Sequence, residues 1–215
     1  NERLNGVPAT DAEQAITSEL TGDEGDDEIA ADRETPALAD AGEESVLRGL
    51  MAKAQSLYGP QNDPKLKALI AGLKPLIQDG FSPIVFCQFI STANYVGQYL
   101  RKAFKTYHVQ VVTGNLAPSE REEAVAALTA DPRRILVATN CLSEGINLQK
   151  GFNAVVHYDL AWNPSRHEQR EGRVDRYGQT SPTVKCLMLY GLDNPVDGFI
   201  LKVILRKAKA IQDQL

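Results

Sequence analysis

A short stretch near residue 170 carries four arginines at spacings of four, three and three residues. At about 100° per residue of an α-helix, the four guanidinium groups lie on one face and three carboxylates lie on the opposite face. Like charges on one helix face repel by about a few tenths of a kcal/mol per pair, so we infer that the arginine face binds an anion. The alternative is a solvated helix with internal salt bridges, although such helices usually mix the two signs along a face. The arginine face comprises Arg166, Arg170, Arg173 and Arg176 with Gln169, and the acidic face comprises Glu168, Glu171 and Asp175.

A polar segment at residues 139–149 directly follows a short apolar run and precedes the arginines in the sequence. Its hydroxyl, amide and carboxylate groups could bond to phosphate or ribose oxygens. Alone, such a segment is also typical of an ordinary exit from a strand. Its position just upstream of the arginines favours a joint site.

The elements that must position these two segments alternate between strands and helices. Five apolar runs predict strands, and the segments between them carry helical periodicity or capping residues. Asp63 before Pro64 predicts a helix start, and Pro75 should kink or end that helix. The alternation predicts an α/β fold with a mostly parallel sheet and helices on both faces. We expect strands at 84–87, 109–112, 135–138, 154–158 and 184–190, and helices at 43–57, 63–75, 91–105, 119–131, from 164 through the arginines, and from 195 onward.

The segments that invite a functional interpretation all follow predicted strands. Ligands of open parallel sheets bind at the carboxyl ends of the strands. Residues 88–92, 113–114, 139–149 and 159 onward should therefore meet along one edge of the sheet.

Charge divides the sequence into two parts. The net charge of -5 combines -12 over residues 1–45 with +7 over residues 46–215. Residues 1–45 are too acidic and too poor in apolar side chains to build a core, so we expect an acidic linker that is flexible or partly helical. Residues 46–215 form the expected domain, and its basic surplus is compatible with a polyanionic partner.

Three widely spaced cysteines favour reduced thiols in a cytosolic protein. No Cys/His spacing typical of a metal site occurs, and His157 within an apolar run is interpreted as a hydrogen-bonded core residue. No apolar run approaches the roughly 18 residues of a membrane span, so no membrane partner is expected. The first residue is not Met, which favours a piece of a longer or processed chain.

Together, the 139–149 segment and the arginine stretch resemble motifs V and VI of superfamily 2 helicases and translocases. The second matches the pattern Gln-Arg-x-Gly-Arg-x-x-Arg at residues 169–176, and residues 84–89 resemble motif IV. Trp162-Asn163-Pro164 and Tyr177-Gly178-Gln179 resemble the Swi/Snf-type branch, and residues 168–179 are particularly similar to bacterial RapA-like members. The resemblance covers about residues 62–215.

This resemblance implies a single RecA-like domain that forms the C-terminal lobe of an ATP-driven nucleic-acid translocase. Arg173 and Arg176 would be arginine fingers that reach the γ-phosphate across a cleft between two lobes. Residues implied to face nucleotide or position the arginine helix are Glu144, Gly145, Asn147, Gln169 and Arg170. Residues implied to face the nucleic-acid backbone are Gln88, Thr113, Gly114, Arg121 and Thr139.

The phosphate loop GxxxxGK[ST] of such enzymes does not occur in the sequence. The resemblance therefore implies that ATP with Mg²⁺ is bound mainly by an N-terminal RecA-like lobe outside these residues, and that the isolated chain is inactive. The expected nucleic acid is double-stranded DNA, and the expected location is the bacterial cytosol or nucleoid. The alternative is a stand-alone nucleic-acid or protein interaction module with a RecA-like fold and no catalysis, which would not need paired arginine fingers.

Overall fold

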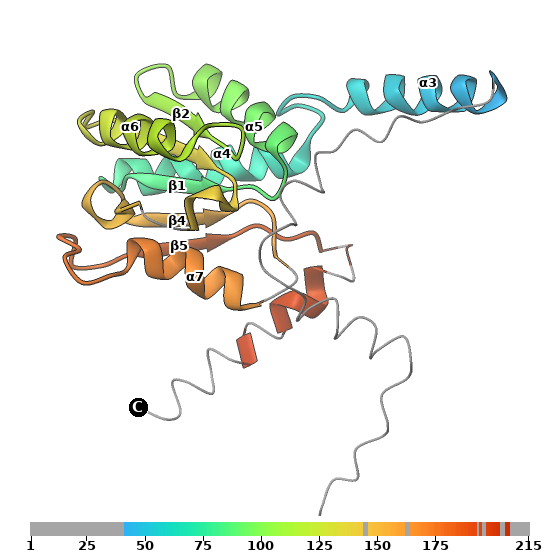
Figure 1. Ribbon diagram of the computed structural model, residues 1–215. Helices are drawn as coiled ribbons and strands as arrows, with labels where there is room; N and C mark the ends of the chain where they lie inside the picture. The colour runs from blue at the N-terminus through green and yellow to red at the C-terminus, as the bar shows by residue number, and fades with distance from the viewer. Residues whose placement is uncertain are drawn as a thin grey trace, which may run out of the picture.

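The computed structural model describes residues 41–143, 146–161, 164–192, 194, 197–202 and 205–206. Strands and helices alternate along these residues, as the sequence predicts (Figure 1). In chain order the elements are α3 (Ala41–Ser56), α4 (Pro64–Gln78), β1 (Pro83–Phe86), α5 (Ile90–Ala103), β2 (His108–Val112), α6 (Pro118–Thr129), β3 (Arg134–Ala138), the 3₁₀ turns η1 (Asn140–Ser143) and η2 (Leu148–Lys150), β4 (Ala154–His157), α7 (Pro164–Val174) and β5 (Lys185–Met188). Residues 197–202 are also helical.

All five strands form one parallel sheet in the order β2-β3-β1-β4-β5. The register pairs Phe86 with both Ala138 and His157, and Val112 with Ala138. The inner strands therefore end level with one another. Because these strands end at the same level, the polar segments that follow them come together at this edge of the sheet.

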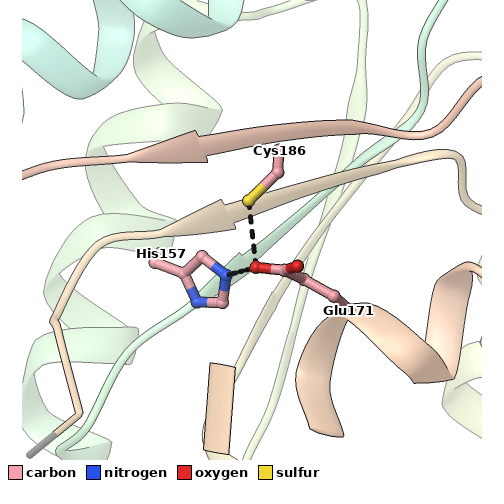
Figure 2. A group of neighbouring side chains, drawn as sticks. All are labelled: His157, Glu171 and Cys186. Atoms are coloured by element: carbon pink, nitrogen blue, oxygen red, sulfur yellow. Dashed lines mark hydrogen bonds and ion pairs between the residues drawn. The ribbon is translucent and has the colours of Figure 1, made fainter. Parts of the chain in front are cut away.

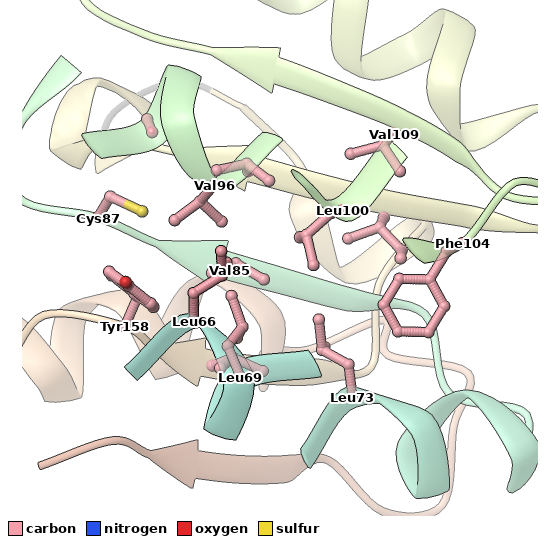
Figure 3. Packing of buried hydrophobic residues seen from close by; sticks show 14 residues of the cluster. Leu66, Leu69, Leu73, Val85, Cys87, Val96, Leu100, Phe104, Val109 and Tyr158 are labelled. Atoms are coloured by element: carbon pink, nitrogen blue, oxygen red, sulfur yellow. The ribbon is translucent and has the colours of Figure 1, made fainter. Parts of the chain in front are cut away.

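Apolar side chains cover both faces of the sheet, because successive residues of each strand point to opposite sides. On one face, α4 and α5 pack on a cluster that includes Val85 and Val137 (Figure 3). On the other face, α6 and α7 contribute to a cluster that includes Ile84 and Leu136. The result is a single three-layer α/β/α domain, the predicted fold class.

Helix starts follow the predicted chemistry only in part. Asp63 caps α4, because its Oδ1 accepts a hydrogen bond from the N–H of Leu66 at 3.0 Å. Of the two effects expected of Pro75, a kink or an end, the end is wrong, since α4 continues to Gln78. Helix α6 begins at Pro118, one residue before the predicted start at 119, and the Glu120 carboxylate accepts a hydrogen bond from the N–H of Ala117 at this end.

The first helix described extends away from the sheet (Figure 1). This helix, α3, exposes apolar side chains that include Val46, Leu50 and Met51. The predicted acidic segment up to residue 40 lies outside the described residues. Among the residues described, no helix is long and apolar enough to span a membrane.

Candidate functional site

The polar segments that follow the strands meet at the carboxyl edge of the sheet. Gln88, Thr113, Thr139 and Asp159 each stand one or two residues after a strand that ends at this edge. Helix α7 packs beside them against β4, η1 and η2. The predicted convergence of these segments is confirmed.

Arg170 points inward and is only 5% exposed. Its Nε and Nη2 donate to Oδ1 of Asn140 at 2.9 and 2.6 Å, and its Nη1 donates to the carbonyl of Asp159 at 3.3 Å. The guanidinium also lies over the ring of Phe86. Arg170 therefore ties α7 to the segments that follow β3 and β4, which is a positioning role.

Two histidines and a carboxylate form a hydrogen-bonded chain beneath α7. In one tautomeric arrangement, the N–H of Ala161 donates to His167 Nε2 (3.1 Å) and His167 Nδ1–H donates to His157 Nδ1 (3.2 Å). His157 Nε2–H then donates to Glu171 Oε1 at 3.0 Å (Figure 2). His157 is fully buried, in agreement with its interpretation as a hydrogen-bonded core residue.

Burial keeps both imidazoles neutral. It lowers the pKa of His157, and burial together with the neighbouring His157 lowers the pKa of His167 to about 4. Burial alone would raise the pKa of Glu171, but the hydrogen bonds from His157 and Cys186 lower it below its ordinary value. The side of α7 that faces the sheet therefore holds a neutral histidine pair against an ionised carboxylate near pH 7.

The arginine helix is shorter than its periodicity predicts. Helix α7 ends at Val174, so Arg173 lies on its last turn and Arg176 lies beyond it. Gln179 closes this end, because its Nε2 donates to the carbonyls of Val174 and Phe152 at 2.9 and 3.0 Å. Gly178 permits the turn with φ of 92°. Arg176 is therefore placed by a turn instead of by helical periodicity.

Arg173 is half-buried and Arg176 is exposed. Within the described residues, neither guanidinium makes a hydrogen bond or an ion pair, in contrast to Arg170. Two unneutralised guanidinium groups at the end of an anchored helix can bind an anion with both forks. Of the predicted arginine face, Arg173 and Arg176 are therefore candidates to bind the anion, whereas the fork of Arg170 is occupied by Asn140.

Arg121 holds two of the edge segments together. Its guanidinium donates to the carbonyls of Gly114 at 3.0 Å, Leu116 at 2.8 Å and Cys141 at 3.2 Å. These three bonds occupy the side chain within the protein. Arg121 thus orients the loop after β2 relative to η1.

The remaining predicted side chains differ in how accessible they are. Thr113 is 7% exposed, and Thr139 is fully buried with no hydrogen-bond partner for its Oγ1 among the described residues. Gln88 is half-buried, and its N–H donates to Asp159 Oδ2 at 3.0 Å. Asn147 and Gln169 are exposed. Glu144 and Gly145 lie outside the described residues.

Asn140 and Asp159 lie in segments that the sequence predicted for this edge, but neither they nor Lys65 were among the predicted site residues. Asp159 pairs with Lys65 at 2.5 Å as well as with the backbone of Gln88, and Lys65 also lies over the ring of Tyr158. Asn140 accepts the fork of Arg170. A polar residue directly after a buried strand is the signal that could have found Asn140 and Asp159, whereas nothing in the spacing points to Lys65.

Comparison with known proteins defines the class of this domain. Residues 64–178, more than half of the chain, match the family described as "Helicase conserved C-terminal domain". The chain belongs to this family, and the domain has the RecA-like fold of helicase C-terminal lobes. The C-terminal part of the Fun30 ATPase domain superposes with a TM-score of 0.58 at 22% identity, covering 65% of this chain and 44% of that one.

Relatives come from more than one branch of the helicases. The chain is 32% identical over 155 residues to Protein CHROMATIN REMODELING 4 of Arabidopsis thaliana, covering 70% of this chain and 7% of that protein. It is 34% identical over 101 residues to ATP-dependent RNA helicase dbp8 of Aspergillus clavatus, covering 47% of this chain and 19% of that protein. The chain thus spans less than a quarter of either relative.

Proposed function

We propose that this chain is the C-terminal lobe of an ATP-driven translocase of the Swi/Snf type, in the RapA-like branch, that moves along double-stranded DNA in the cytoplasm. In this proposal residues 46–215 form the lobe and residues 1–45 form an acidic linker. An N-terminal RecA-like lobe of the same protein completes the enzyme. The similarity to the Arabidopsis chromatin-remodelling relative over 70% of the chain supports the Swi/Snf assignment.

The single observation that carries the proposal is the contrast within one motif between anchored and unneutralised arginines. Arg170 fixes α7 to the carboxyl edge through Asn140. Arg173 and Arg176 are left without hydrogen bonds or ion pairs in the described part of the chain. Arginine forks held in this way suit the charge that develops on a transferring phosphoryl group. We assign these two residues as the arginine fingers.

Asp159, a described carboxylate at this edge, is already paired with Lys65 and is therefore not available for Mg²⁺. The proposal therefore assigns Mg²⁺ and the β- and γ-phosphates to the other lobe, where a phosphate loop would bind them. ATP supplies the phosphoryl group whose transfer drives the motion. On this chain, Glu144, Gly145, Asn147 and Gln169 would contact the nucleotide.

The loop after β2 would contact the nucleic-acid backbone. Thr113 and Gly114 would face phosphates, with Gln88 beside them after β1, and such contacts carry no base sequence. Arg121 would act by holding the Gly114 loop against η1, because three carbonyls occupy its guanidinium. Thr139 would act in the same indirect way, since its hydroxyl is buried.

The test is nucleic-acid-stimulated ATP hydrolysis, measured on the isolated chain and on the protein with both lobes. The isolated chain should hydrolyse no ATP above background. The two-lobed protein should be stimulated by duplex DNA and should displace a third strand from a triplex without separating the duplex. Robust ATP turnover by the isolated chain would contradict the proposal that hydrolysis needs a second lobe.

A second candidate is the C-terminal lobe of an RNA-stimulated ATPase. It is favoured by the similarity to the Aspergillus protein named as an RNA helicase. The same assay separates the two, because stimulation by RNA and not by duplex DNA would select the second candidate. Binding to nucleic acid without ATP turnover in the two-lobed protein would instead select the non-catalytic interaction module.

A further inference from the structure

Three side chains of metal-binding types converge where α7 crosses the last two strands. His157 ends β4, Glu171 lies on α7, and Cys186 lies on β5 (Figure 2). His157 Nε2 is 3.0 Å from Glu171 Oε1, Cys186 Sγ is 3.2 Å from the same oxygen, and the three ligand atoms lie within 4.8 Å of one another. We propose that His157, Glu171 and Cys186 form a binding site for a borderline divalent transition metal ion, with Zn²⁺ as the preferred ion.

Two of the three ligand-atom spacings are close to what a tetrahedral ion requires, and the third, between His157 Nε2 and Cys186 Sγ, lies within 4.8 Å and would close toward the same range. Bonds of about 2.0–2.3 Å place neighbouring ligand atoms about 3.3–3.8 Å apart. The hydrogen-bonded contacts of 3.0 and 3.2 Å need to widen by only a few tenths of an ångström. The imidazole, carboxylate and thiolate donors form a mixed N, O, S set that suits Zn²⁺ better than Mg²⁺ or Ca²⁺.

The outer partners of the histidine are already in place. A metal on His157 Nε2 leaves the proton on Nδ1, which lies 3.2 Å from His167 Nδ1. His167 then carries its proton on Nε2, which lies 3.2 Å from the carbonyl of Ala161. Ala161 thus offers both a donor and an acceptor to His167, so this ring is hydrogen-bonded in either tautomer. Such partners fix the orientation of metal-binding histidines.

Charge explains why the thiolate is needed. The Arg170 guanidinium lies 3.5 Å from His157 Nδ1 and opposes added positive charge. Glu171 and a Cys186 thiolate together neutralise a divalent ion, with one proton released from the thiol. The thiol lies on the exposed edge strand β5, so the fourth position is open to a water ligand. A bound ion would fasten α7 to β4 and β5.

Residue spacing does not reveal this site, because its ligands are 14 and 15 residues apart on three elements. Short ligand spacings such as Cys-x-x-Cys are absent from the sequence. Only the parallel pairing of β4 with β5 brings His157 and Cys186 to one face of α7. Neither Arg173 nor Arg176 is a ligand of this site. The metal proposal is therefore independent of their assignment as arginine fingers.

The test is Co²⁺ titration of the 215-residue chain after removal of metals with a chelator, followed by visible absorption. We expect one Co²⁺ per chain, with a thiolate-to-cobalt charge-transfer band and the intense bands of tetrahedral Co²⁺, all removed by Zn²⁺. C186S should lose the charge-transfer band, and H167Q should weaken binding by about 10- to 100-fold. The matched control C141S, which removes another thiol that forms no disulfide, should leave the spectrum unchanged.

Absence of the charge-transfer band in the wild-type chain would overturn the proposal. So would a band that survives in C186S or disappears in C141S. X-ray absorption of the wild-type Zn²⁺ complex gives a check that needs no variant: one sulfur in the first shell supports the site, and none contradicts it.

Discussion

Arg170 and the pair Arg173 and Arg176 belong to one motif yet occupy opposite environments. Arg170 is buried and its fork is occupied by Asn140 and by the carbonyl of Asp159. The other two lie at and beyond the helix end, with no hydrogen bond or ion pair among the described residues. The same side-chain chemistry thus serves positioning in Arg170, and in our proposal it serves anion binding in Arg173 and Arg176. The difference is set by where α7 faces the sheet and where it ends.

The largest expected effect is a difference in stability between variants of Arg170 and variants of Arg173. R170A leaves Asn140 without its donors and removes a buried side chain, so it should lower the free energy of unfolding by about 3 kcal/mol or more. R173A and the control R133A, an exposed arginine before β3, should change it by less than about 0.5 kcal/mol. Urea unfolding at pH 7 measures all three, and equal losses in R170A and R173A would erase the contrast.

The inward side of α7 should also make stability depend on pH. The unfolded chain binds a proton on His167 at its ordinary pKa near 6.5, whereas the folded chain binds it only at about 4. The unfolded state therefore holds more protons in between, and stability falls as pH decreases through this window, by on the order of 2 kcal/mol.

The lowered pKa values of His157 and Glu171 act in the same direction, Glu171 toward the acidic end of the window. Urea unfolding between pH 7.5 and pH 4, with a chelator present, measures the slope. H167Q should flatten it, and the surface variant H108Q should not. A wild-type stability that is flat over this range would argue against the buried histidine pair.

A smaller effect concerns the end of the helix. Q179A removes the hydrogen bonds to Val174 and Phe152 and one accepted from the N–H of Ser181. It should cost about 1–2 kcal/mol and speed amide hydrogen exchange in the last turn of α7. Q169A, at an exposed position on the same helix, is the control and should do neither; protection unchanged in Q179A would mean that the turn is held by other contacts.

The smallest effect concerns the buried hydroxyl of Thr139. T139V replaces a hydroxyl that has no partner in the described structure with a methyl group of similar shape. Stability should stay the same or rise by about 1 kcal/mol at most, and DNA affinity of the two-lobed protein should be unchanged. A loss of affinity at unchanged stability would show that this hydroxyl contacts the nucleic acid directly.

The fold was predictable because it rests on short apolar runs. Each expected strand overlaps an observed one, and parallel pairing then places the polar segments at one edge. The burial of Arg170 was not predictable, because helical periodicity indicates the direction of a side chain but not the residues against which it packs. The end of α7 depends on Gln179, five residues beyond Val174. Likewise, only the folded chain brings Cys186 to Glu171.

The most direct test of the central claim is steady-state ATP turnover of the two-lobed protein carrying R173A or R176A, with R133A as the control. We predict a loss of turnover of about 10³-fold or more in both variants, with duplex-DNA affinity and the free energy of unfolding close to those of the wild type. Turnover preserved in either variant would contradict its assignment as an arginine finger.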